Sequence, residues 1–177
     1  MKAKSLLLLT ISLSLGIFIP SARAKTPSIV VPPPANTPLE LSLLTPTVAL
    51  KNGVVTASNI SQKQLTIPSI WWAKEQFGGK LLDNWLAYPA KETASARIDL
   101  IVNRQIWSLL DYVERYEFVN NFSNLARDYG YNVRVFNYQQ ELLATYTCNF
   151  NVQPRLCRVE NLNALGKSSV RGSKVTP

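Results

Sequence analysis

A strand, a helix and a second strand follow one another between Arg97 and Asn137, and this order constrains the fold more than any other feature. Arg97–Asn103 is rich in branched apolar residues, and Asn132–Asn137 alternates apolar with polar residues, as strands do. Arg104–Tyr129 has the apolar spacing of a helix, and Gly130 follows it where a helix C-terminus favours glycine. Two strands joined by a helix lie parallel in one sheet, so the sequence predicts a βαβ unit.

A β-hairpin is predicted after this unit, from strands at Leu142–Phe150 and Leu156–Glu160. A turn around Asn151–Pro154 places Cys148 directly opposite Cys157. Cβ atoms in such cross-strand pairs come within about 4.5–5.5 Å, close to disulfide reach. The predicted fold class is therefore α/β (α+β): a small mixed sheet with a βαβ unit followed by a disulfide-bridged β-hairpin, with helices packed on the sheet.

Two further elements are predicted before the βαβ unit. Asn52-Gly53 within Val48–Ala57 is the dipeptide of a type I′ turn and indicates a small hairpin. A helix is expected to begin at Pro68 and to end at Tyr88. Gly78-Gly79 should break this helix or divide it into two short ones.

The long helix predicted over Arg104–Tyr129 changes its apolar face along its length. We expect either a bend near Glu117–Asn121 or packing between two layers. The first apolar group contains Ile106, Leu109, Leu110, Val113 and Tyr116, and the nearly opposite group contains Phe122, Leu125, Ala126 and Tyr129.

The N-terminus has the pattern of a cleaved export signal over residues 1–24. Lys2 and Lys4 precede the apolar run Ser5–Ile19, and the small residues Ala22 and Ala24 form a signal-peptidase site. The apolar run spans about 22 Å as a helix, which is short of the roughly 20 residues needed to cross a bilayer. The alternative is an uncleaved N-terminal membrane anchor.

The remaining chain divides into three parts. Residues 25–46 hold six prolines and are predicted to form a Pro-rich spacer. Residues 47–161 form a single α/β domain, of which 47–67 is the N-terminal hairpin region. Residues 162–177 are predicted to be a disordered basic tail. Its Lys167, Arg171 and Lys174 could make weak contact with an anionic surface, and no nucleic-acid partner is expected, because the tail has no aromatic residue to stack on a base.

The chain contains no histidine, and its formal net charge of +8 comes from lysine and arginine. This absence excludes Ser-His-Asp and Cys-His catalysis and histidine metal sites. No catalytic, cofactor or metal site is predicted. Asp99 lies in an apolar strand and is expected to pair with Arg97, Arg134 or Arg104.

Trp71 and Trp72 give the most specific functional indication. Adjacent residues of a helix cannot both point into a core, so one of the two should be exposed. Exposed tryptophan is a frequent anchor at protein interfaces. We therefore predict that Trp71 and Trp72 form a partner-binding site.

Three stretches, Trp71–Trp85, Ile101–Gln105 and Asp128–Asn137, resemble small exported proteins of cyanobacteria. The similarity covers Pro68–Asn137, and it implies the periplasm or the thylakoid lumen as destination but no catalytic activity. The favoured function is that of an exported, non-enzymatic domain that binds a protein partner in the envelope or in a membrane-associated assembly. The alternative is a carboxylate-based hydrolase acting on envelope glycan. It requires a cleft in which two carboxylates converge from the set Asp99, Asp111, Glu114, Glu117 and Asp128.

Overall fold

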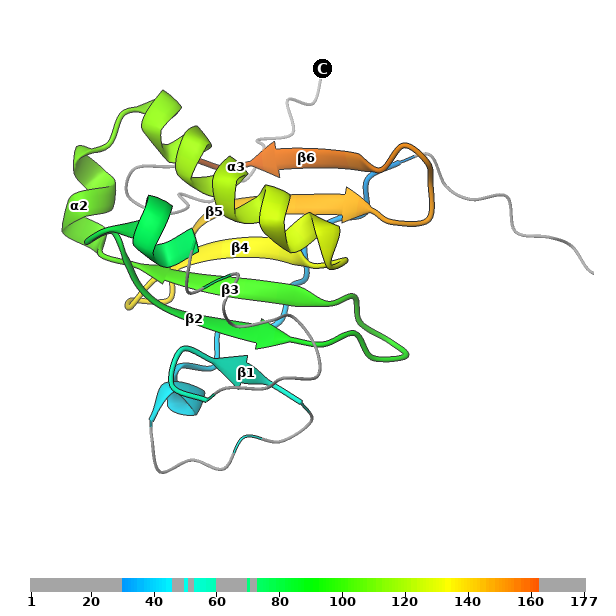
Figure 1. Cartoon of the computed structure of the whole chain (residues 1–177), viewed down its shortest axis with the longest axis horizontal. Coiled ribbons are helices and arrows are strands. Elements are labelled where there is room, and N and C mark those ends of the chain that lie inside the picture. Colours follow the sequence, from blue (N-terminus) through cyan, green and yellow to red (C-terminus); the bar gives the residue numbers. More distant parts are fainter. Residues whose placement is uncertain (1–29, 46–49, 51–52, 60–69, 71–72, 163–177) are drawn as a thin grey trace, which may run out of the picture.

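The structure, a computed structural model, describes residues 30–45, 50, 53–59, 70 and 73–162. Its centre is a six-stranded mixed sheet in the order β1-β2-β3-β4-β5-β6 (Figure 1). Only the β3–β4 pair is parallel among these strands. The predicted mixed α+β sheet is therefore confirmed. The strands are β1 (Val55–Thr56), β2 (Leu82–Tyr88), β3 (Arg97–Val102), β4 (Asn132–Asn137), β5 (Leu142–Asn149) and β6 (Leu156–Glu160).

The parallel strands β3 and β4 are joined by two helices, α2 (Arg104–Leu109) and α3 (Tyr112–Asp128). α3 lies across one face of the sheet (Figure 1). The predicted βαβ unit is thus present, with the crossover divided into two helices. The main apolar core lies between this face and the helices, and it includes Trp85, Leu100, Val102, Trp107, Val119, Phe122, Val133, Val135 and Leu143.

The crossover divides at Asp111, and not at the bend predicted near Glu117–Asn121. The Asp111 side chain accepts a hydrogen bond from the Glu114 backbone N–H, and the Glu114 carboxylate accepts one from the Asp111 backbone N–H, both at 2.8 Å. This reciprocal capping box satisfies donors at the start of α3 and fixes its first residue. At the other end Gly130, with φ +80°, follows α3 as predicted, and the Tyr131 N–H donates to the Ala126 carbonyl.

The helix predicted to reach Tyr88 is wrong over its second half, because Leu82–Tyr88 forms strand β2. A short helical turn, η2 (Lys74–Gly78), precedes this strand. Gly79, with φ +46°, ends the turn, so the break predicted at Gly78-Gly79 is present. The strand of the expected Asn52-Gly53 hairpin that the structure describes, β1, pairs with β2. Residues 46–49 and 51–52 lie outside the described chain.

The face of the sheet opposite α3 is covered by residues 30–45, which we call the N-terminal belt. The belt runs behind the sheet from β5 toward β1 and ends in a short 3₁₀ helix, η1 (Leu41–Leu44) (Figure 1). Asn149 Nδ2 donates to the Val30 carbonyl at 3.0 Å, and Leu39 is buried in a second apolar cluster with Leu86, Tyr88, Ile101 and Phe136. The sequence assigned this segment to a spacer, whereas its described part packs on the domain.

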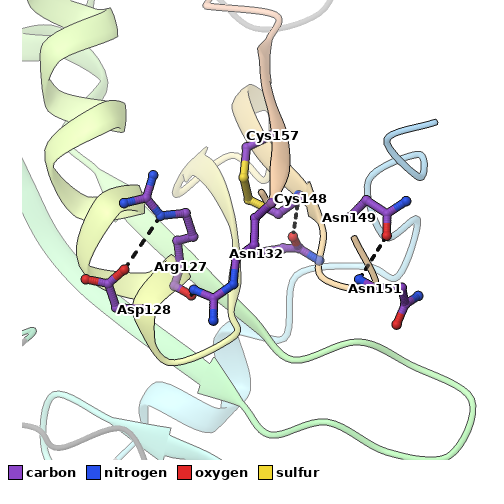
Figure 2. The surroundings of a disulfide bond; sticks show 8 residues. Arg127, Asp128, Asn132, Cys148, Asn149, Asn151 and Cys157 are labelled. Carbon is purple, nitrogen blue, oxygen red and sulfur yellow. Dashed lines mark hydrogen bonds and ion pairs between the residues drawn. A yellow bond between two sulfur atoms is a disulfide. The ribbon is translucent and has the colours of Figure 1, made fainter. Parts of the chain in front are cut away.

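The β5–β6 hairpin contains the predicted disulfide. Cys148 and Cys157 are register partners, and a disulfide joins them with a Cα–Cα distance of 4.0 Å (Figure 2). The Cys148 backbone N–H donates to Asn132 Oδ1 at 2.8 Å, which ties the hairpin to the start of β4. The predicted Cys148–Cys157 bridge is confirmed.

Candidate binding surface

The binding residues predicted from the sequence, Trp71 and Trp72, lie outside the described residues. Their neighbours Ile70 and Ala73 are both buried in the main core. Ala22 and Ala24, which are predicted to form the signal-cleavage site, and the tail residues Lys167, Arg171 and Lys174 also lie outside the described chain.

Figure 1 shows the corner where α2 meets α3. Several apolar residues on either side of this corner are exposed, and we call them the corner patch. It consists of Leu109, Tyr112, Val113 and Tyr116, of which Leu109 is 83% and Val113 58% exposed. Tyr112 and Tyr116 are four residues apart and therefore neighbours on the helix surface. Single exposed apolar residues are normal in soluble proteins, whereas a large group of them indicates an interaction site. Here four such residues lie within Leu109–Tyr116.

Acidic side chains border the corner patch. Asp111, Glu114 and Glu117 are exposed on the same first turns of α3. Glu114 and Glu117 also line a hollow of about 200 Å³ whose apolar wall includes Leu110 and Phe118. The surface therefore offers apolar contact area beside a concave site of negative charge.

Arg115 fixes this corner from the inner side of α3. Its guanidinium donates to the backbone carbonyls of Trp107, Leu110 and Leu162. The first two lie in and just after α2, and the third follows β6. Because the half-buried Arg115 side chain joins α3 to α2 and to the segment after β6, the patch is displayed on a braced scaffold and not on a loop.

The carboxylates considered for hydrolysis occupy different settings. Asp99 is fully buried, and Asp111 and Glu114 satisfy the capping box of α3. Asp128, at the far end of α3, has a 67% exposed side chain and pairs with Arg127 at 3.6 Å (Figure 2). Glu114 and Glu117 line a common hollow, but the Glu114 carboxylate already accepts a hydrogen bond from the Asp111 backbone N–H.

Asp99 forms a buried ion pair with Arg134. A charged side chain in an apolar strand was expected to need such a partner. Arg134 donates from Nε and Nη2 to the two Asp99 carboxylate oxygens at 2.7 Å each, and Arg97 Nε lies 3.6 Å from Oδ2. Arg134 Nη1 donates further to the belt carbonyls of Ala35 and Thr37. The expected pairing with Arg97 and Arg134 is confirmed, and its role is structural.

Tyr88 completes this buried polar cluster. The Arg97 guanidinium carbon lies 3.8 Å from the Tyr88 ring centroid, a cation–π arrangement. Burial, reinforced by the neighbouring Asp99 and Glu40 carboxylates, raises the pKa of Tyr88, although Arg97 opposes the shift. The phenol is therefore neutral throughout the physiological range.

Neither a metal site nor a membrane span is found in the part of the chain that the structure describes. Within it, no three His, Cys, Asp or Glu side chains are arranged to hold a metal ion. None of its helices combines the length and apolarity needed to cross a bilayer. Comparisons with protein-family models, with curated proteins and with solved structures found no match.

The sequence contains a signal for the corner patch, but the apolar spacing alone does not show that its residues are exposed. Leu109, Val113 and Tyr116 were grouped with Leu110 on one side of a single long helix. The break at Asp111 turns that side outward, so three of these residues become exposed. The spacing Asp111-x-x-Glu114 was the readable signal, because it is the signature of a capping box.

Proposed function

We propose that this protein is an exported, non-enzymatic domain that binds a protein partner through the corner patch. The observation that carries the proposal is the exposure of Leu109, Tyr112, Val113 and Tyr116 together on a braced helical corner. Interface cores are enriched in tyrosine, and the patch contains Tyr112 and Tyr116.

The charge around the patch indicates the chemistry of the partner. Asp111, Glu114 and Glu117 are interspersed with the apolar residues along the chain, and Glu114 and Glu117 line the hollow. A complementary surface presents apolar side chains together with lysine or arginine, one of which can enter the hollow. We therefore infer a partner protein with a basic, apolar segment.

The proposed compartment is the periplasm or the thylakoid lumen. A disulfide such as Cys148–Cys157 persists in oxidising compartments and is rare in reducing ones. The apolar run Ser5–Ile19 with Ala22 and Ala24 supplies the corresponding export pattern. The partner is accordingly expected in the envelope or in a membrane-associated assembly.

The test uses a photo-crosslinking amino acid in the mature, oxidised protein. Placed at Tyr112, it should crosslink one protein from the native envelope and membrane fraction. Placed at Tyr138, which is exposed in the turn after β4, it should not. The captured protein is then purified and titrated by calorimetry. Val113→Glu should weaken its binding at least tenfold, whereas Tyr138→Ser should leave the affinity unchanged.

Two results would contradict the proposal. Equal crosslinking from Tyr112 and Tyr138 would show that the corner patch has no special role. Unchanged affinity in a folded Val113→Glu variant would show the same. A Trp71→Ala, Trp72→Ala variant, measured in parallel, tests the tryptophan site separately, so the two candidate surfaces can be distinguished.

A further inference from the structure

The edge of the sheet at β6 is a second candidate for an interaction surface. β6 is the last strand of the sheet in the described chain, and it spans Leu156–Glu160. The opposite edge strand, β1, has only two residues. An edge strand presents backbone N–H and C=O groups that can pair with another strand.

The disulfide identifies which backbone groups of β6 face outward. In antiparallel pairs, Cα atoms lie about 5.5 Å apart where the two residues hydrogen-bond to each other and about 4.5 Å apart where they do not. Cys148 and Cys157 are 4.0 Å apart, so they form a non-hydrogen-bonded pair. The N–H and C=O of Cys157 therefore point away from β5, and by alternation those of Val159 do as well.

The side chains of β6 are complementary to a second copy of the same strand. Arg158 and Glu160 lie on the same face, where they are 51% and 34% exposed and form an ion pair at 3.2 Å. In an antiparallel self-pairing centred on Val159, the two central residues hydrogen-bond to each other. Arg158 of each copy then lies opposite Glu160 of the other, in the closer, non-hydrogen-bonded type of pair.

We propose that two copies of this protein associate through β6, antiparallel about a twofold axis at Val159, to form one continuous sheet. The interface is isologous, so the same strand serves both copies and no further strand can add at that edge. Both outward N–H groups of the central Val159 pair are satisfied, and two Arg158–Glu160 pairs connect the copies.

A charge exchange tests the register. The mature, oxidised protein should be dimeric by analytical ultracentrifugation. Arg158→Glu alone and Glu160→Arg alone should each weaken the dimer at least tenfold, because like charges then face each other across the axis. The double variant Arg158→Glu, Glu160→Arg should restore the dimer. A monomeric native protein, or a double variant that dimerises no better than the singles, would overturn the proposal.

A backbone substitution tests the edge itself. Val159→Pro removes an N–H that faces away from β5, so the hairpin should form while the dimer is lost. Arg158→Pro removes an N–H that bonds to β5 and should melt the hairpin, which provides the matched comparison. A dimer that persists in a folded Val159→Pro variant would place the contact elsewhere. Dimer loss in Val159→Pro with partner binding intact separates this interface from the proposed function.

Discussion

Asp99 and Arg134 join two central strands and the N-terminal belt at one buried point. The two residues are register partners in the parallel β3–β4 pair. The Arg134 guanidinium also donates to two backbone carbonyls of the N-terminal belt. Replacing both members of a buried ion pair by apolar residues of similar volume often costs no stability. Removing only one member is destabilising, because the other charge stays buried without a partner. The arrangement therefore fixes which strands and which segment meet.

Asp99→Ala should lower the free energy of unfolding by about 3–5 kcal/mol, because Arg134, with a side chain only 3% exposed, keeps its charge without its counter-ion. Urea denaturation measures this change. The control is Asp128→Ala, whose exposed pair with Arg127 should contribute less than about 1 kcal/mol. Equal effects of the two substitutions would contradict a special role for the buried pair.

Tyr88 should make the protein sensitive to alkaline pH. Its pKa is raised, mainly by burial, above the value of about 10 that tyrosine has in an unfolded chain. The folded state therefore keeps the phenol proton at pH values where the unfolded state has lost it, and stability falls as the pH rises above about 10. Tyr88→Phe should reduce the slope of stability against pH in this range. Tyr138→Phe, at an exposed site, should not change it.

At the scale of elements, the strands of the βαβ unit and of the hairpin could be predicted from sequence, whereas β2 could not. β4 and β6 have the bounds that the sequence indicated, because alternation and the cysteine register are local signals. β2 has apolar residues on both faces. Trp85 belongs to the main core, and Leu86 belongs to the second apolar cluster, which lies under the N-terminal belt. The register shift between Leu82 and Asn84 removes the remaining alternation, so the apolar spacing imitates a helix.

The belt was missed for a related reason. Its prolines indicated an extended segment, which is correct for a chain that crosses a sheet, but they do not show whether that segment packs. The missed signal was the apolar series Leu39, Leu41, Leu43 and Leu44, which places four side chains at or near the second cluster. The corner patch was missed as well, because its exposure depends on where α2 ends, which only the Asp111-x-x-Glu114 spacing indicates.

Leu39→Ala should therefore lower the free energy of unfolding by about 2–5 kcal/mol, because Leu39 is buried against Leu86 and Ile101. Thermal or urea unfolding of the mature protein measures the change. Pro33→Ala, at an exposed position of the same belt, should have an effect within about 1 kcal/mol. No effect of Leu39→Ala would mean that the segment behaves as the spacer predicted from its composition.

For the whole molecule, the two proposed surfaces lie on different elements. The corner patch lies on the helical layer at the α2–α3 corner, and the β6 edge lies at the end of the strand order. A twofold pairing through β6 uses none of the four corner-patch residues. A dimer would thus present two equivalent patches, and linked sites of this kind strengthen binding to a partner that is itself repeated.

The export pattern and the disulfide together predict the state in which the whole chain reaches its compartment. If Ala22 and Ala24 form the signal-peptidase site that the sequence predicts, the exported protein should begin at Lys25. Oxidation there should join Cys148 to Cys157. Intact-mass spectrometry should show loss of residues 1–24 and of two hydrogens. Ala24→Asp should retain the leader, because the cleavage pattern is lost. An exported chain that keeps residues 1–24, or one with both thiols free, would contradict this prediction.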